Sequence, residues 1–125
     1  MRLEHIALQV AEPARMAAWY CEHLGMKVVD QVGDACFFIV DEGGAMLEIY
    51  HSPAEGVPDY AAKTPLELHV AFWTDDVPGD CARLASAGAT IVRPPDDPSA
   101  DFQQAMLRDP WGLVVQLIKR AKRLN

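Results

Sequence analysis

The stretch from Leu66 to Thr74 reads LELHVAFWT and has His69 at its centre. A similar stretch, LEHIALQV, runs from Leu3 to Val10, so a histidine followed by a β-branched residue and then alanine recurs 64 residues later. Internal repetition is typical of a fold built from copies of one unit. We therefore predict two structural copies, with the second beginning at this stretch.

The first copy shows the pattern of a strand, a helix and three further strands. Residues 2–10 alternate between polar and apolar side chains, which predicts a strand with one apolar face. Apolar residues then follow at helical spacing from Pro13 to a stop at Gly25. Turns containing glycine separate the next three predicted strands, which lie at about 26–32, 35–41 and 45–51.

The second copy repeats this order. After the strand at 66–74, Asp76 offers an N-cap for a helix that stops at Gly88. The remaining predicted strands are 89–93, 102–108 and 112–119, and the last two are joined by a tight turn at 109–112.

These elements predict an α+β domain made of two tandem βαβββ modules with a curved, mostly antiparallel sheet. The boundaries of the parts are module one at about 2–51, a linker at 52–64, module two at about 65–119 and a basic C-terminal tail at 120–125. The linker is predicted from its content of Pro, Ala and Gly, which shows no sustained period.

Composition excludes several classes of partner. The chain has 125 residues and a formal net charge of −7, which argues against nucleic acid because phosphate contacts need basic patches. No segment approaches the roughly 20 apolar residues of a membrane span, and the N-terminus lacks a signal-peptide pattern. We predict a cytoplasmic protein.

The three cysteines are Cys21, Cys36 and Cys81. Their odd number and their spacing fit neither a disulfide framework nor a zinc site. Each is predicted to be a small buried hydrophobic residue.

Polar side chains occupy matching positions in the two copies, and they suggest a metal site. These candidate ligands are His5 and Glu48 in the first copy and His69 and Gln116 in the second. Alternation within each strand places them on the face opposite the apolar core residues. A lone His or Glu on a strand is more often structural, but the repetition favours a shared role. Two imidazoles, a carboxylate and an amide oxygen suit a divalent cation, and a Glu within so apolar a strand is costly to bury unless it is paired or binds a metal.

The chain resembles the vicinal oxygen chelate superfamily, which includes glyoxalase I, extradiol dioxygenases and bleomycin-resistance proteins. The resemblance covers about residues 2–119. It rests on His5-Ile6-Ala7, Leu47-Glu48-Ile49, Leu68-His69-Val70-Ala71 and the turn Asp109-Pro110-Trp111-Gly112.

The resemblance implies a glyoxalase-like fold, in which paired βαβββ modules form a sheet cleft around a divalent metal ion such as Ni, Zn, Mn, Fe or Co. His5, Glu48 and His69 stand where glyoxalase I has metal ligands, whereas Gln116 departs from the family pattern, in which that position is normally Glu. A homodimer is also implied, with the cleft formed either within one chain or between two.

The implied activity is that of a lyase or isomerase whose small-molecule substrate chelates the metal through neighbouring oxygens. Glu48 is the candidate catalytic base, because Gln116 cannot accept a proton. Two alternatives stay open: a metal-free binder of the bleomycin-resistance kind and a non-haem iron dioxygenase. Strand parity suggests Tyr50, Trp73 and Gln104 as substrate contacts.

Overall fold

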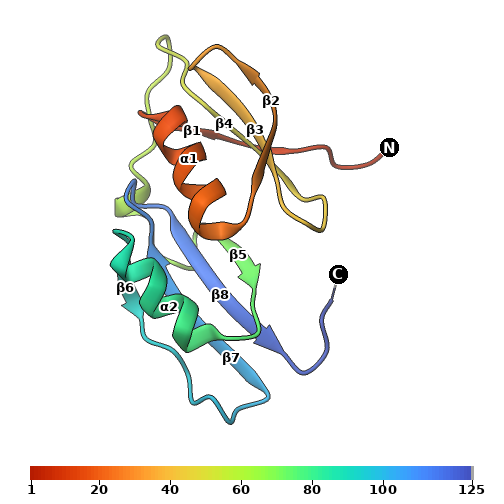
Figure 1. Ribbon diagram of the computed structural model, residues 1–125. Helices are drawn as coiled ribbons and strands as arrows, with labels where there is room; N and C mark the ends of the chain where they lie inside the picture. Colours follow the sequence, from red (N-terminus) through yellow and green to blue (C-terminus); the bar gives the residue numbers. More distant parts are fainter. Residues whose placement is uncertain (125) are drawn as a thin grey trace. The chain divides into compact units, whose positions relative to one another are not determined.

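The computed structural model describes residues 1–124, which form two compact units, Met1–Pro58 and a second that begins at Asp59. The first unit contains β1 (Ile6–Gln9), α1 (Pro13–Leu24), β2 (Lys27–Val32), β3 (Cys36–Val40) and β4 (Met46–Tyr50). The second contains the 3-10 helix η1 (Tyr60–Ala62), β5 (His69–Trp73), α2 (Val77–Ser86), β6 (Thr90–Arg93), β7 (Phe102–Arg108) and β8 (Val114–Arg120). Figure 1 shows the βαβββ order twice, which confirms the predicted α+β architecture.

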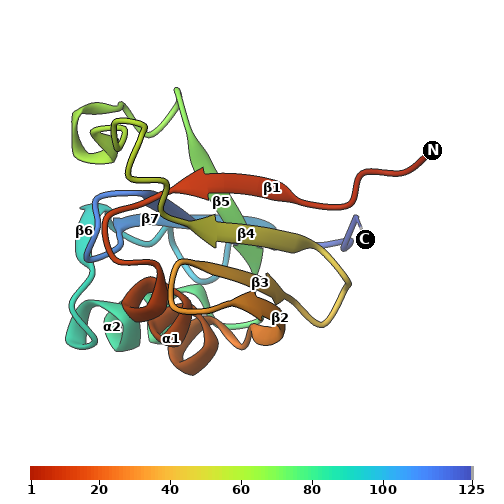
Figure 2. The same ribbon diagram turned by 90° about the horizontal axis from the view of Figure 1, so that it is seen from above.

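Each unit has one mixed four-stranded sheet with the same topology. The strand order is β1-β4-β3-β2 in the first and β5-β8-β7-β6 in the second. The first and last strands of each unit pair in parallel, and the other neighbours pair antiparallel, so both sheets are mostly antiparallel as predicted. The first sheet can be followed in Figure 2.

The helices begin and end where the sequence indicates. Pro13 occupies the first turn of α1, and Gly25 ends it in the left-handed conformation at φ 71°, which glycine adopts without a Cβ penalty. The Asp76 side chain accepts a hydrogen bond from the Gly79 amide and caps α2. Neither helix in residues 1–124 is long and apolar enough to span a membrane.

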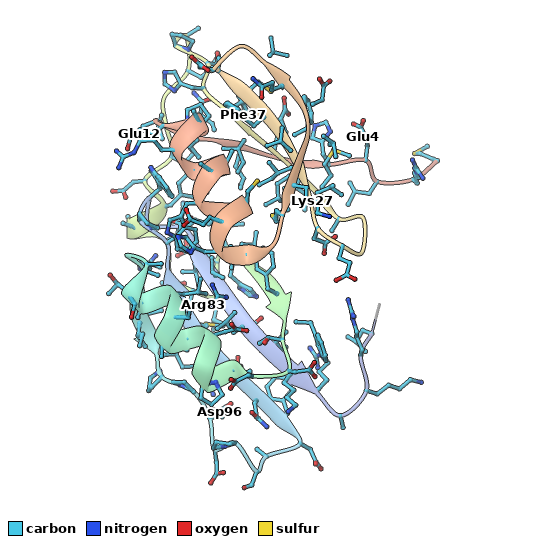
Figure 3. All side chains as sticks on the ribbon, viewed as in Figure 1. Glu4, Glu12, Lys27, Phe37, Arg83 and Asp96 are labelled. Carbon is cyan, nitrogen blue, oxygen red and sulfur yellow. The ribbon has the colours of Figure 1, made fainter. Side chains whose placement is uncertain are left out.

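One face of each sheet packs against its helix. In the first unit Ile39 and Ile49 are fully buried, and Phe37, labelled in Figure 3, pairs with Ile49 on the same face. In the second unit Ala105 and Leu117 form the equivalent buried pair under α2. The opposite face of each sheet carries the candidate ligands, as the alternation predicts.

The first strand of each unit is much shorter than predicted, and each begins at or directly after a candidate histidine. β1 begins at Ile6, directly after His5, and β5 begins at His69, because residues 65–68 form a turn. Ile6 is 54% exposed, so the apolar face predicted for residues 2–10 is buried only from Leu8 onward. Each histidine therefore lies at the N-terminal end of a strand, where the preceding residues can reach its ring.

The predicted linker 52–64 is partly structured, because η1 lies within it. The Arg108 guanidinium donates hydrogen bonds to the carbonyls of Tyr60 and Lys63 at 3.1 and 2.7 Å. The later part of this segment therefore packs on the second unit. At the other end, β8 continues to Arg120, one residue into the predicted tail.

Candidate functional site

The first unit brings His5 and Glu48 together. Glu48 lies in the middle of β4 opposite Ala7, and His5 is two residues before Ala7 on the same face. The imidazole Nε2 is 3.1 Å from Glu48 Oε2, and the two side chains are 28% and 22% exposed. The Phe38 ring meets the imidazole edge-on, with centroids 5.5 Å apart. Two of the four predicted ligands thus form a half-buried pair.

The second ring nitrogen of His5 is held from outside the strand. Glu4, labelled in Figure 3, places Oε2 at 2.6 Å from His5 Nδ1. A carboxylate can only accept a hydrogen bond, so Nδ1 donates. This arrangement fixes the ring orientation and is typical of histidines that bind a metal through Nε2.

His69 shows the same arrangement in the second unit. Its Nδ1 lies 2.8 Å from the Pro65 carbonyl oxygen. A carbonyl oxygen is an acceptor, so Nδ1 carries the proton and the neutral ring keeps its lone pair on Nε2. The turn at 65–68 thereby selects the tautomer that can coordinate a cation.

Gln116 is nine-tenths buried on the same face as His69, because it pairs with Ala71 in the parallel register. Its Nε2 donates a 2.7 Å hydrogen bond to Gln104 Oε1. With the amide nitrogen engaged, the oxygen of Gln116 retains both lone pairs. That oxygen is the atom that could serve as a ligand.

Cys36 is not the buried residue that the sequence predicted, and it contacts the candidate site through Glu48. All three cysteines were expected to be buried hydrophobic residues; Cys81 is buried, whereas Cys21 and Cys36 are only half-buried. The Cys36 thiol donates a hydrogen bond to Glu48 Oε1 at 3.4 Å. Burial, and then the hydrogen bond and charge of Glu48, raise the pKa of this thiol. Cys36 lies twelve residues before Glu48, as Gln104 does before Gln116, and this spacing is the signal that identifies it.

The predicted substrate contacts have different surroundings. Tyr50 is half-buried and pairs with Gln9 on the face that carries Glu48. The Trp73 ring lies under the Arg123 guanidinium, 5.0 Å from the ring centroid, and its Nε1 is buried without a hydrogen-bond partner in residues 1–124. Gln104 accepts a hydrogen bond from Gln116 and so restrains that side chain.

The donor chemistry fits a divalent cation. Each unit offers one imidazole with its Nδ1 engaged and one oxygen donor, Glu48 or Gln116. Mixed nitrogen and oxygen donors suit Zn, Ni, Mn, Fe or Co. Within residues 1–124 no three His, Cys, Asp or Glu side chains are grouped around one point as metal ligands.

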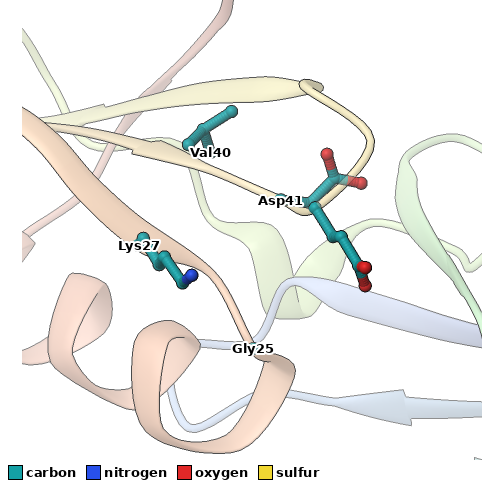
Figure 4. A pocket seen from close by; sticks show the side chains of 5 residues that line it. Gly25, Lys27, Val40 and Asp41 are labelled. Carbon is teal, nitrogen blue, oxygen red and sulfur yellow. The ribbon is translucent and has the colours of Figure 1, made fainter.

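A separate pocket of about 380 Å³ lies in the first unit, and Figure 4 shows its lining of Gly25, Lys27, Val40, Asp41 and Glu42. None of the candidate ligands lines it. It lies near the start of β2 and the end of β3, and three of its five lining residues are charged.

Residues 2–117 match the sequence model of the family described as "Glyoxalase/Bleomycin resistance protein/Dioxygenase superfamily". No curated protein sequence matches the chain. Among solved structures, TnmS3, an antibiotic binding protein from Streptomyces sp. CB03234, is 25% identical, with 96% of both chains covered and a TM-score of 0.70. Glyoxalase I from Zea mays is 25% identical with a TM-score of 0.75; 97% of this chain covers 45% of that one. TioX from Micromonospora sp. ML1 is 22% identical, with 96% and 99% coverage and a TM-score of 0.67, which shows the shared fold.

Proposed function

Because this chain belongs to the glyoxalase, bleomycin resistance protein and dioxygenase superfamily, we propose that it is a metal-dependent lyase or isomerase of the glyoxalase type. Its substrate would be a small molecule with two neighbouring oxygens. The observation that carries the proposal is the state of the two histidines. Both engage Nδ1, with Glu4 or with Pro65, and Nε2 of His5 faces Glu48 Oε2, the oxygen proposed to bind the cation beside it.

The proposed ligands are His5, Glu48, His69 and Gln116. A divalent cation held by them would polarise substrate oxygens and stabilise negative charge that develops on them. The protein's contribution is the fixed orientation of the two rings and of the Gln116 oxygen. Donors from both units are required, so the proposal includes a cleft that these donors share, within one chain or between two copies in a cytoplasmic homodimer.

Glu48 is the proposed base. Its carboxylate faces His5 through one oxygen and Cys36 through the other. Among the proposed ligands only Glu48 is a carboxylate. The Gln116 amide cannot accept a proton at working pH. A single carboxylate can take a proton from one carbon and return it to the adjacent one. This favours an isomerisation by one base over a two-base epimerisation.

The test is the metal content of protein purified without chelator. About one divalent ion per chain is expected, which His69→Ala and Glu48→Gln should largely remove because each deletes a ligand or its charge. His23→Ala is the matched control, because His23 lies on α1 and outside the ligand set. Isomerase activity on a hemithioacetal that depends on the bound ion would support the reaction. Metal-free protein, or equal metal content in all four proteins, would exclude the proposed centre.

A metal-free ligand-binding protein is the second candidate. The TnmS3 comparison favours it, because that antibiotic binding protein matches over nearly the full length of both chains. Trp73 is consistent with it, since its ring already accepts the Arg123 cation and aromatic rings bind cationic or planar ligands. Tight binding of a drug by chelator-treated protein, unaffected by Glu48→Gln, would favour this candidate over the enzyme.

A further inference from the structure

Equivalent hydrogen bonds tie Glu48 and Gln116 to the neighbouring strand. In the first unit the Cys36 thiol on β3 donates to Glu48 Oε1 on β4 at 3.4 Å. In the second unit Gln104 Oε1 on β7 accepts from Gln116 Nε2 on β8 at 2.7 Å. In both units the partner lies twelve residues earlier in the chain.

The register shows that these bonds occupy the same place in the repeated fold. Glu48 pairs directly with Phe38, and Gln116 pairs directly with Met106. Cys36 and Gln104 each lie two residues before that direct partner, on the same face of the sheet. The two contacts are therefore the same diagonal cross-strand contact, made with different side chains.

The chemistry of each partner matches the group it holds. Glu48 accepts hydrogen bonds, and its partner is a thiol that donates one. The carboxylate keeps Oε2 directed at His5 Nε2. Gln116 is bound through its donor end, and its partner Gln104 supplies an acceptor. In both units the bond engages one terminal atom, and the other terminal atom is an oxygen: Glu48 Oε2, which faces His5 Nε2, and Gln116 Oε1.

We infer that Cys36 and Gln104 are positioning residues, which orient Glu48 Oε2 and Gln116 Oε1 toward the bound cation. This inference rests on the proposed metal-dependent function. The terminal torsion of Glu and Gln side chains is broad and roughly two-fold, so packing alone does not select one orientation. For Gln116 the selection matters more, because a half-turn would present N–H groups to a cation in place of the oxygen.

The orientation of Gln116 can be tested in metal-free protein. We expect the Gln116 side-chain amide protons to exchange slowly with solvent in a ¹⁵N–¹H NMR spectrum. Gln104→Met removes the acceptor at similar length and should speed this exchange, whereas Gln104→Glu keeps an acceptor and should retain the protection. An amide signal that does not change in Gln104→Met would overturn the assignment of Gln104.

The effect on the cation is measured by calorimetric titration of chelator-treated full-length protein with Zn²⁺. Cys36→Ala and Gln104→Met should each weaken binding by about tenfold, the usual cost of losing a partner of a metal ligand. Cys36→Ser and Gln104→Glu should restore most of the affinity, because each keeps the hydrogen-bonding role. The unfolding midpoint of each metal-free variant shows whether the fold is intact.

The outcomes separate the two proposals. Wild-type affinity in both Cys36→Ala and Gln104→Met would overturn the positioning roles while leaving the metal centre standing. A wild-type protein that binds no Zn²⁺ would overturn the metal centre. The roles of Cys36 and Gln104 toward a cation would be overturned with it, and the Gln116 amide would then show only whether Gln104 holds the Gln116 side chain.

Discussion

Glu48 and His5 meet across the parallel pair of strands in the first unit, with Oε2 of the carboxylate 3.1 Å from Nε2 of the imidazole. Both side chains are less than one-third exposed. The contact joins the N-terminal end of β1 to the centre of β4 even without a bound ion. In the proposed metal centre the same two atoms are neighbouring ligands.

The strength of this contact is predicted from its exposure. A double-mutant cycle with His5→Ala and Glu48→Ala in metal-free protein should give a coupling of about 0.5–1 kcal/mol, because solvent screening limits partly exposed pairs. Urea unfolding near neutral pH measures it. Arg15→Ala with Glu12→Ala, an exposed pair 2.7 Å apart, is the comparison and should couple more weakly. A coupling near zero for His5 and Glu48 would show that the contact contributes nothing to the free fold.

Much of the fold could be predicted because its signals are local. Pro13 and Gly25 bound α1, Asp76 caps α2, and the alternation in β4 and β8 separates core residues from candidate ligands. The repeat then supplies the long-range information, because equivalent residues must occupy equivalent places. These features depend on backbone preferences and side-chain period, which one sequence displays directly.

The surroundings of the candidate ligands could not be predicted in the same way. The Pro65 carbonyl reaches His69 only because residues 65–68 turn before β5, and an apolar-polar pattern does not specify which carbonyl faces a ring. The contact of Cys36 with Glu48 is diagonal across two strands, so it depends on a register that only pairing defines. An isolated cysteine in an apolar strand instead resembles a core residue.

The tautomer of His69 follows from the Pro65 carbonyl. Because that oxygen can only accept, neutral His69 should be protonated on Nδ1 and bare on Nε2. Long-range ¹⁵N–¹H correlation spectra of metal-free protein distinguish the two nitrogens. On addition of Zn²⁺ the Nε2 signal should move more than the Nδ1 signal. A ring found with its proton on Nε2 would contradict both the hydrogen bond and the ligand role.

Glu67 holds the turn that presents this carbonyl. Its Oε2 accepts a 2.6 Å hydrogen bond from the Thr64 amide, while its own amide donates to the Thr64 carbonyl. The Thr64 backbone hydrogen bond lowers the pKa of Glu67 below its usual 4.5. Its contribution to stability is therefore present above pH 4.5 and is lost as the pH falls through the lower, folded-state value.

A ¹³C titration should accordingly place the Glu67 carboxyl midpoint below 4.5, and the Thr64 amide proton should titrate with the same midpoint. In Glu67→Gln the amide keeps an acceptor that does not ionise, so the shared titration should disappear from the Thr64 signal. A Glu67 midpoint at or above 4.5 would show that the turn does not hold the carboxylate in solution.

Gln116→Glu tests the position at which this chain departs from the usual family pattern. A carboxylate there should raise affinity for Zn²⁺ about tenfold, because added ligand charge strengthens binding of a divalent cation. In the wild-type protein Gln104 Oε1 accepts from Gln116 Nε2. Rotation of the Gln104 amide would instead direct its nitrogen to donate to the new carboxylate. Gln31→Glu, on the exposed strand β2, makes the same change in net charge away from the site. Calorimetric titration of both variants separates the two effects: equal gains would assign the change to net charge, whereas a gain confined to Gln116→Glu would place residue 116 next to the cation.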